Sequence, residues 1–513
     1  MTHALTHAFA PPSVADDRRS PLVLTLLWAA GAGADAAAAK GAFRAAAGAA
    51  GRALDRWGEF YRPPALARLV FWRAEPPAPA ILAAAEAEGL VVEPRDVADA
   101  ACDVAIVAGR DFARLAPGTP ALIAALGEPP RLVARAAAGL DHRSGRRGEV
   151  EATPEALAEA LLAPPRATIE RRRLRDYQAE DADKRPLRFE YELLLRVIGA
   201  REKGAGGDDD AWERAAAVNA AASVDRGATL SALRAEYERA DALALAYGRR
   251  WRSTLAARSF LLFVVNLISG LVGNLMPAFF PETAAIQFIV TAGIFVDQRM
   301  ASKGRWRAKW IDYRRAAETT RIARFCALVG APAPAGTPPS WIDWRLERIM
   351  RRDALAEAPA EADAAAILAH LRGVEIDRQI SYHRRAHRRF RRLDVELRRA
   401  ATVALMATFA LGVALTILAS AGVVDKRIPL LGAVGLALSA APGLYAVLNG
   451  LRGQLDVDRQ ADRSARVGVA LRGLRRSLDG EPPSAALARA AATRAAEIMR
   501  DDVSSWDRVM EIV

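Results

Sequence analysis

Four long stretches of the chain contain no charged residue, although charged residues make up 26% of the sequence. These stretches cover residues 259–276, 283–296, 400–424 and 428–451. A helix needs about 20 predominantly apolar residues to cross a bilayer, with a range of roughly 17–25. Only a short break separates the two members of each pair. The pattern therefore predicts four transmembrane helices arranged as two hairpins, 259–296 and 400–451.

The N-terminal part has a different pattern, in which short apolar runs alternate with helix-like segments. Residues 22–28 form a continuous apolar run that is typical of a buried parallel strand. Further strands are expected at 67–72, 90–93, 103–108 and 131–133, and helices in the alanine-rich segment ending near 57, at 78–89 and at 119–126. This alternation predicts an α/β layer with a parallel sheet. We therefore expect a Rossmann-like α/β domain followed by a mainly α-helical membrane region.

These patterns divide the chain into seven segments. Residues 1–20 lack an apolar core, so we expect a disordered N-terminus and not a secretory signal peptide. The expected segments after it are an α/β domain (21–165), a helical stalk (166–258), hairpin one (259–296), a charged helical segment (297–399), hairpin two (400–451) and a helical tail (452–513). Each hairpin follows a basic helix that carries an aromatic residue and precedes a charged helix, at an offset of about 148 residues. This likeness suggests an internal repeat.

Basic residues are concentrated beside the apolar stretches. The net charge is +12, and arginines precede and follow both hairpins, most densely between Arg384 and Arg399. By the positive-inside rule, both ends of each hairpin face the cytoplasm, despite Lys426 and Arg427 in the second turn. We expect a multi-pass plasma-membrane protein with both termini inside. The placement of the charge favours anionic lipid headgroups as partners and not nucleic acid, which requires a basic face interleaved with aromatics.

Two turns of the α/β domain are candidate ligand sites, because ligands bind beyond the carboxyl ends of parallel strands. Gly31 and Gly33 follow the first predicted strand, and Gly109, Arg110 and Asp111 follow the fourth. Glycines there could let backbone amides approach a phosphate, but the third glycine of a dinucleotide fingerprint is missing. The weakness of this partial motif favours an ordinary tight turn on its own. If the turns hold a ligand, a nucleotide is the candidate.

Candidate catalytic and metal-binding groups are few. Cys102 and Cys326 are too few for a disulfide framework or a cysteine-based zinc motif. His383 and His387 share a helix face, but arginines flank them and no acidic residue lies between them. No nucleophile-elbow or phosphate-loop motif is present in the sequence. We therefore expect no catalytic residue, no metal and no cofactor.

Polar and small residues line one face of the first apolar stretch. Asn266, Gly270, Gly273 and Asn274 follow helical spacing, and Gln287 is polar in the second stretch. Amides in lipid must find partners in other helices or in water. One interpretation is a hydrogen bond between helices, and the other is the lining of a pore in an oligomer. The second hairpin lacks comparable amides but contains Ser439 and a kink-forming Pro442-Gly443.

The segments around the hairpins share motifs with a known family. YERADALALAYGRRWRS precedes hairpin one and WIDYRRAAETTRIARF follows it, while SWIDWRLERIMRR and QISYHRRAHRRFRRLD precede hairpin two. In this order, and in the motif YRxAAExxRxxRF, residues 230–475 resemble the bacterial two-transmembrane effector domains called SLATT. That family is named for its association with nucleotidyltransferases and SLOG sensors.

The resemblance implies a role in prokaryotic conflict systems such as antiphage defence. Such domains are proposed to be membrane effectors that form pores and are coupled to a nucleotide-sensing module. The Rossmann-like domain then takes the position of the SLOG sensor, and the chain is expected to form a homo-oligomer in the bacterial inner membrane. Two alternatives remain, a membrane-anchored nucleotide-processing enzyme and a non-catalytic membrane scaffold.

Overall fold

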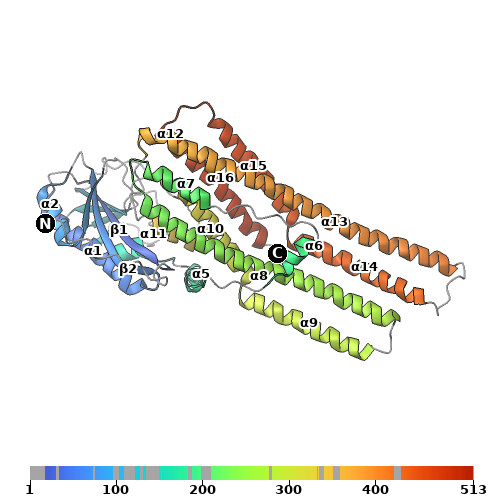
Figure 1. The fold of residues 1–513 in the computed structure, drawn as a ribbon. Helices are drawn as coiled ribbons and strands as arrows, with labels where there is room; N and C mark the ends of the chain where they lie inside the picture. The colour runs from blue at the N-terminus through green and yellow to red at the C-terminus, as the bar shows by residue number, and fades with distance from the viewer. Residues whose placement is uncertain are drawn as a thin grey trace.

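A computed structural model of the protein consists of a small α/β layer and an elongated helical body. The structure describes residues 18–30, 34–72, 76–95, 103–108, 122–126, 131–134, 150–151, 153–165, 167–182, 188–197, 209–275, 280–331, 333, 340–350, 359–420 and 429–511. The sheet lies at one end of the molecule, and long helices extend away from it to the other end (Figure 1). One cluster of buried apolar residues continues from the sheet into the helices, so the two parts share a core.

Seven described strands form one sheet, in the order β3-β2-β1-β4-β5-β6-β7. They are β1 (Ser20–Trp28), β2 (Tyr61–Trp72), β3 (Val91–Arg95), β4 (Val104–Ala108), β5 (Leu122–Leu126), β6 (Arg131–Ala134) and β7 (Val150–Glu151). The pairs from β3 to β5 are parallel, and β6 and β7 add antiparallel strands at one edge. The expected parallel α/β layer is confirmed, and the order 3-2-1-4-5 is that of doubly wound, Rossmann-like sheets.

Strand β1 lies inside the sheet between β2 and β4, and its apolar side chains are buried on both faces, as in other parallel sheets. Helix α1 (Ala36–Trp57) packs on β1 and β2 through alanines and Phe43 spaced three and four residues apart. The Asp35 carboxylate begins this helix by accepting a hydrogen bond from the Ala37 amide at 3.0 Å. Helix α2 (Pro79–Ala87) connects β2 to β3.

One predicted element of the α/β layer is wrong. The pattern of residues 119–126 predicts a helix, whereas Leu122–Leu126 is strand β5, paired with β4 on one side and β6 on the other. The apolar run LIAAL is too short for its periodicity to distinguish a buried strand from a helix. The pairing with strands β4 and β6 on either side decides the outcome.

Helices make up the rest of the described chain. They are α4 (Pro154–Leu157), the π-helical turn η2 (Ala158–Leu162), α5 (Thr168–Ala179), α6 (Glu190–Val197), α7 (Asp209–Ala220), α8 (Gly227–Leu275), α9 (Phe280–Lys303), α10 (Trp306–Leu328), α11 (Trp341–Met350), α12 (Glu361–His370), the π-helical turn η4 (Leu371–Ile376), α13 (Asp377–Ser420), α14 (Pro429–Gln454), α15 (Val457–Ser477) and α16 (Ala485–Glu511). Figure 1 shows α8, α9, α13 and α14 extending furthest from the sheet.

Two of these helices are far longer than the apolar stretches within them. Helix α8 has 49 residues and α13 has 44. The predicted segment boundaries at 258/259 and 399/400 fall inside these helices, so each predicted span continues a charged helix without a break. In the described chain, two helical stretches, Gly227–Gly270 and Glu361–Leu418, are long and apolar enough to cross a membrane by length and composition.

The two hairpins are built in the same way. In each, a long helix leads into a second apolar helix, and a third, charged helix then packs back along the first: α10 along α8, and α15 along α13. The junction between the second and third helices has a left-handed residue in both cases, Arg305 with φ 51° and Asp456 with φ 47°. Non-glycine residues rarely adopt this conformation. This shared feature, 151 positions apart, supports the internal repeat expected from the sequence.

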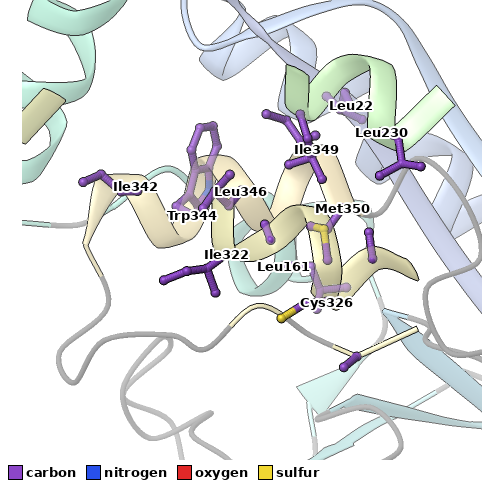
Figure 2. Packing of buried hydrophobic residues seen from close by; sticks show 14 of the residues in the cluster. Leu22, Leu161, Leu230, Ile322, Cys326, Ile342, Trp344, Leu346, Ile349 and Met350 are labelled. Carbon is purple, nitrogen blue, oxygen red and sulfur yellow. The ribbon is translucent and has the colours of Figure 1, made fainter. Parts of the chain in front are cut away.

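Helix α11 joins the sheet to the helical body. The Trp344 indole donates a hydrogen bond to the Ala163 carbonyl at 3.1 Å and contacts the Tyr61 ring edge-on. Arg345 pairs with buried Glu236 of α8 and also donates to the Arg18 carbonyl beside β1. On other sides of α11, Leu346 and Met350 lie among apolar residues of α10, β1 and η2 (Figure 2). These contacts fix the orientation of the sheet relative to α8 and α10.

Candidate functional site

An arginine-rich cavity of about 610 Å³ lies in the charged part of the helical body, beside the apolar ends of the long helices. Its walls come from α6, α8, α10, α13, the α14–α15 junction and α16, so both repeats contribute. Nine of the residues lining it are arginines, and three are acidic: Glu192, Glu318 and Asp502. The lining therefore has a large excess of positive charge.

Helix α6 closes one side of the cavity because polar contacts hold it against the start of hairpin one. The Tyr191 amide donates to the Ser253 hydroxyl at 3.3 Å. Arg188 donates to the Thr254 hydroxyl at 3.0 Å and pairs with Asp297 of α9 at 2.9 Å. Two helices of the first repeat are thus tied together next to the cavity.

Several of the cavity arginines are neutralised by carboxylates. Arg314 pairs with Asp241 at 3.0 Å and also contacts Glu318. Further pairs are Arg321 with Glu318, Arg463 with Asp502, Arg249 with Glu192 and Arg258 with Asp297. Ionised Glu318 is favoured by these arginines, which hold the pKa of its carboxyl below the usual value against the effect of burial.

Two cavity arginines lack such a partner. Among the described residues, neither Arg252 of α8 nor Arg389 of α13 has a carboxylate within ion-pair distance. Arg252 donates to the Gly248 carbonyl at 3.1 Å, and its guanidinium lies 5.1 Å and 5.5 Å from the ring centres of Tyr191 and Trp310. Burial lowers the pKa of Arg252, and the positive charge of Arg389 lowers this pKa further.

His383 is a second unusual group in the cavity wall. Its side chain is 5% exposed, and its Nδ1 atom is buried without a hydrogen-bond partner. Burial lowers the pKa of His383, so the neutral imidazole is favoured. His387, which shares a helix face with it, instead approaches the Ala461 carbonyl with Nδ1 at 2.9 Å. The two histidines therefore lie in different surroundings. Among the described residues, no cluster of His, Cys, Asp and Glu side chains could hold a metal ion.

The polar face predicted in hairpin one is divided between two contacts. Gln287 of α9 donates a hydrogen bond to the Ser269 hydroxyl of α8, which joins the two helices. Asn266 donates to the Leu262 carbonyl of its own helix at 2.8 Å and lies against Gly443 of α14. Each of these two amides thus donates one hydrogen bond within the chain, and the bond of Gln287 joins two helices.

The other predicted residues of this face belong to α8. Gly270 is buried in the helix, and Gly273 and Asn274 continue it, with side-chain surroundings outside the described set. Asn266 and Gly443 mark where α8 packs along α14, next to Pro442 inside α14. The proline-glycine pair singled out in the sequence therefore lies at the contact between the two hairpins.

Three of the apolar helices, α8, α9 and α13, leave large hydrophobic side chains uncovered. Phe288 of α9 is 75% exposed and Phe409 of α13 is 70% exposed. Others on α8, α9 and α13 are Phe260, Leu262, Ile286, Ile289, Phe295, Val296, Met300, Val403, Leu405, Met406, Val413, Ile417 and Leu418. Apolar patches of this extent on a soluble protein mark interaction or membrane surfaces. Together with the uncharged stretches, they indicate an apolar environment around these helices.

The candidate ligand residues of the α/β domain, Gly31, Gly33, Gly109, Arg110 and Asp111, lie outside the described residues. Sequence reasoning missed the cavity, because its arginines come from helices separated by up to hundreds of positions. The only local signal is the density of arginine beside each hairpin, which on the sequence alone indicates lipid headgroups. No protein-family model matches the chain, and neither a curated protein nor a solved structure is detectably similar to it.

Proposed function

We propose that this chain is a bacterial inner-membrane effector, with four spans in two hairpins and a cytoplasmic body that controls them in response to a ligand. The uncharged composition and uncovered apolar side chains of α8, α9 and α13 support insertion. The arginines beside both hairpins support cytoplasmic ends and contacts with anionic lipid headgroups. The resemblance of residues 230–475 to SLATT domains supports a role as a pore-forming homo-oligomer in antiphage defence.

One observation carries the ligand-controlled part of this proposal. Helices α8 and α13 each run without a break from the wall of the arginine-rich cavity into the apolar region. A change in the distance between them at the cavity therefore moves their apolar ends as well. Helix α14 packs against both of them. Such a change would alter the contact between Asn266 of α8 and Gly443 of α14.

The proposal is tested by ion leak in a bacterial host that expresses the full chain. Membrane depolarisation is followed with a voltage-sensitive dye, and we expect the wild type to depolarise the cells. Because the polar face of α8 is proposed to line the conducting assembly, the double variant Asn266→Leu/Asn274→Leu should reduce depolarisation to the level of cells without the protein. The lipid-facing variant Phe288→Leu is the control and should behave like the wild type.

Other outcomes favour the alternative functions. Unchanged depolarisation in the double variant would show that this face does not line a pore. Absence of depolarisation in the wild type, combined with loss of nucleotide from a solution of the purified protein, would favour a membrane-anchored nucleotide-processing enzyme. Absence of both effects would favour a membrane scaffold.

A further inference from the structure

The charge of the cavity is unbalanced in a way that ordinary packing does not explain. Desolvating a guanidinium without an acidic partner is unfavourable, and neighbouring cations add repulsion. Arg252 is partly buried, its charge is disfavoured by Arg389, and the described chain offers neither of them a carboxylate. Ionisable side chains whose charge is disfavoured by their surroundings cluster at functional sites. The arrangement is relieved if an anion enters the cavity.

The chemistry of the lining selects the kind of anion. Arginine presents parallel N–H groups that match the oxygens of a phosphate and can bind two of them at once. The volume of about 610 Å³ is within the range of small-molecule sites, roughly 300–1,000 Å³. Tyr191, Trp310 and Phe390 add apolar and aromatic surface for a non-phosphate portion. His383 offers a buried ring nitrogen that has no partner of its own.

We infer that this cavity binds a phosphate-bearing ligand between Arg252 of α8 and Arg389 of α13, one from each repeat. The inference rests on the proposed function, since it names the chemistry of the controlling ligand and moves its site from the α/β domain to the helical body. Neutralising both arginines removes their repulsion, so the bound anion draws α8 and α13 together below their apolar ends. The phosphate belongs either to a soluble molecule or to a lipid headgroup.

The experiment measures binding to the purified full-length protein in detergent. One arm titrates inorganic pyrophosphate and ATP in a calorimeter. The second arm reconstitutes the protein into nanodiscs and compares phosphatidylglycerol with phosphatidylcholine, counting bound lipid by native mass spectrometry after extraction. We expect one saturable site per chain in one of the two arms. Binding of pyrophosphate or ATP assigns a soluble ligand, and retention of phosphatidylglycerol alone assigns a lipid headgroup.

Two neighbouring arginines supply a matched pair of variants. Arg389→Gln removes a cavity cation, whereas Arg388→Gln removes an exposed one from the same helix that does not line the cavity. We expect Arg389→Gln to weaken binding at least about tenfold, the effect of losing a charge-assisted hydrogen bond, and Arg388→Gln to leave the affinity within about twofold. Arg252→Lys keeps the charge but loses the planar fork, and should weaken binding to an intermediate degree.

Two results would overturn the inference. One is the absence of saturable binding by the wild type in both arms, which requires no variant to fold. The other is an equal loss in Arg388→Gln and Arg389→Gln, which would mean a diffuse electrostatic effect. Unchanged thermal unfolding of each variant shows that the cavity is intact. Ligand binding without ion leak would contradict the proposed function and leave this inference standing. Ion leak without ligand binding would contradict this inference and leave the proposed function standing.

Discussion

Several charged side chains of the helical body form buried ion pairs, and the pair of Glu375 with Arg324 is the clearest case. Its carboxylate accepts hydrogen bonds from Arg324 at 2.9 Å and 2.7 Å, and His370 approaches it at 3.2 Å. All three side chains are buried. The positive charge of Arg324 outweighs burial and lowers the pKa of Glu375 to about 2. An arginine left in this position without its partner would be an uncompensated buried charge.

This pair gives a pH-dependent prediction. Because the folded-state pKa of Glu375 is depressed, its contribution is fully present above the unfolded value of about 4.5 and is lost as pH falls toward 2. The shift corresponds to about 3 kcal/mol of unfolding free energy. Thermal unfolding in detergent at pH 7 and pH 3.5 should show part of this loss in the wild type, about 1.4 kcal/mol. Glu375→Gln should be destabilised at pH 7 and should lose less on acidification.

The control for this prediction is Glu497→Gln. Glu497 forms an exposed pair with Arg494 on α16, and such pairs contribute roughly 0–1 kcal/mol. We expect its unfolding temperature and acid sensitivity to match those of the wild type. If Glu375→Gln retained the full acid sensitivity of the wild type, the carboxylate of Glu375 would not be the group that titrates.

At the scale of elements, a close contact between α8 and α10 beside the cavity depends on Gly248. Helices α8 and α10 approach so closely there that an added Cβ would lie 2.9 Å from the Trp310 ring and 3.1 Å from the Arg252 guanidinium. Both of these side chains line the cavity. The absence of a side chain at this position thus allows the ring of Trp310 to lie over α8.

Gly248→Ala should therefore be harmful although alanine favours helix. The gain in helix propensity is about 1 kcal/mol, and displacing a packed ring costs typically 1–3 kcal/mol. We expect a lower unfolding temperature and a weakened affinity of the cavity for its ligand. The matched control is Gly473→Ala in α15, where nothing lies within 4 Å of the added Cβ and a small stabilisation is expected. Equal stabilisation of both variants would contradict the close contact.

At the scale of the whole molecule, the four proposed spans predict a different topology from two spans formed by α8 and α13 alone. Four spans place the turn of hairpin one outside the cell and the end of α9 inside. If only α8 and α13 crossed, α9 would not carry the chain back, and these two positions would lie on the same side. Glu282 and Ser302 are exposed positions near the two ends of α9, so they can report the difference.

We predict opposite labelling of Glu282→Cys and Ser302→Cys by a membrane-impermeant maleimide on intact cells. Glu282→Cys should react, and Ser302→Cys should react only after the membrane is opened. Cys102 is replaced by serine, and Cys326 can remain, because burial raises the pKa of its thiol to about 12 and keeps it unreactive. Reaction of both introduced cysteines on intact cells, or of neither, would contradict four spans.

The sequence alone determined the features that depend on local pattern. Strand β1, the alanine-rich helix α1 and the helices over the uncharged stretches were predictable because each kind of element imposes a characteristic length and spacing of apolar residues. Tertiary structure alone decided that residues 122–126 form β5, that Gln287 bonds to Ser269, and that Arg252 and Arg389 share a cavity. Each of these depends on contacts between separate elements, which the side-chain pattern within one element does not encode.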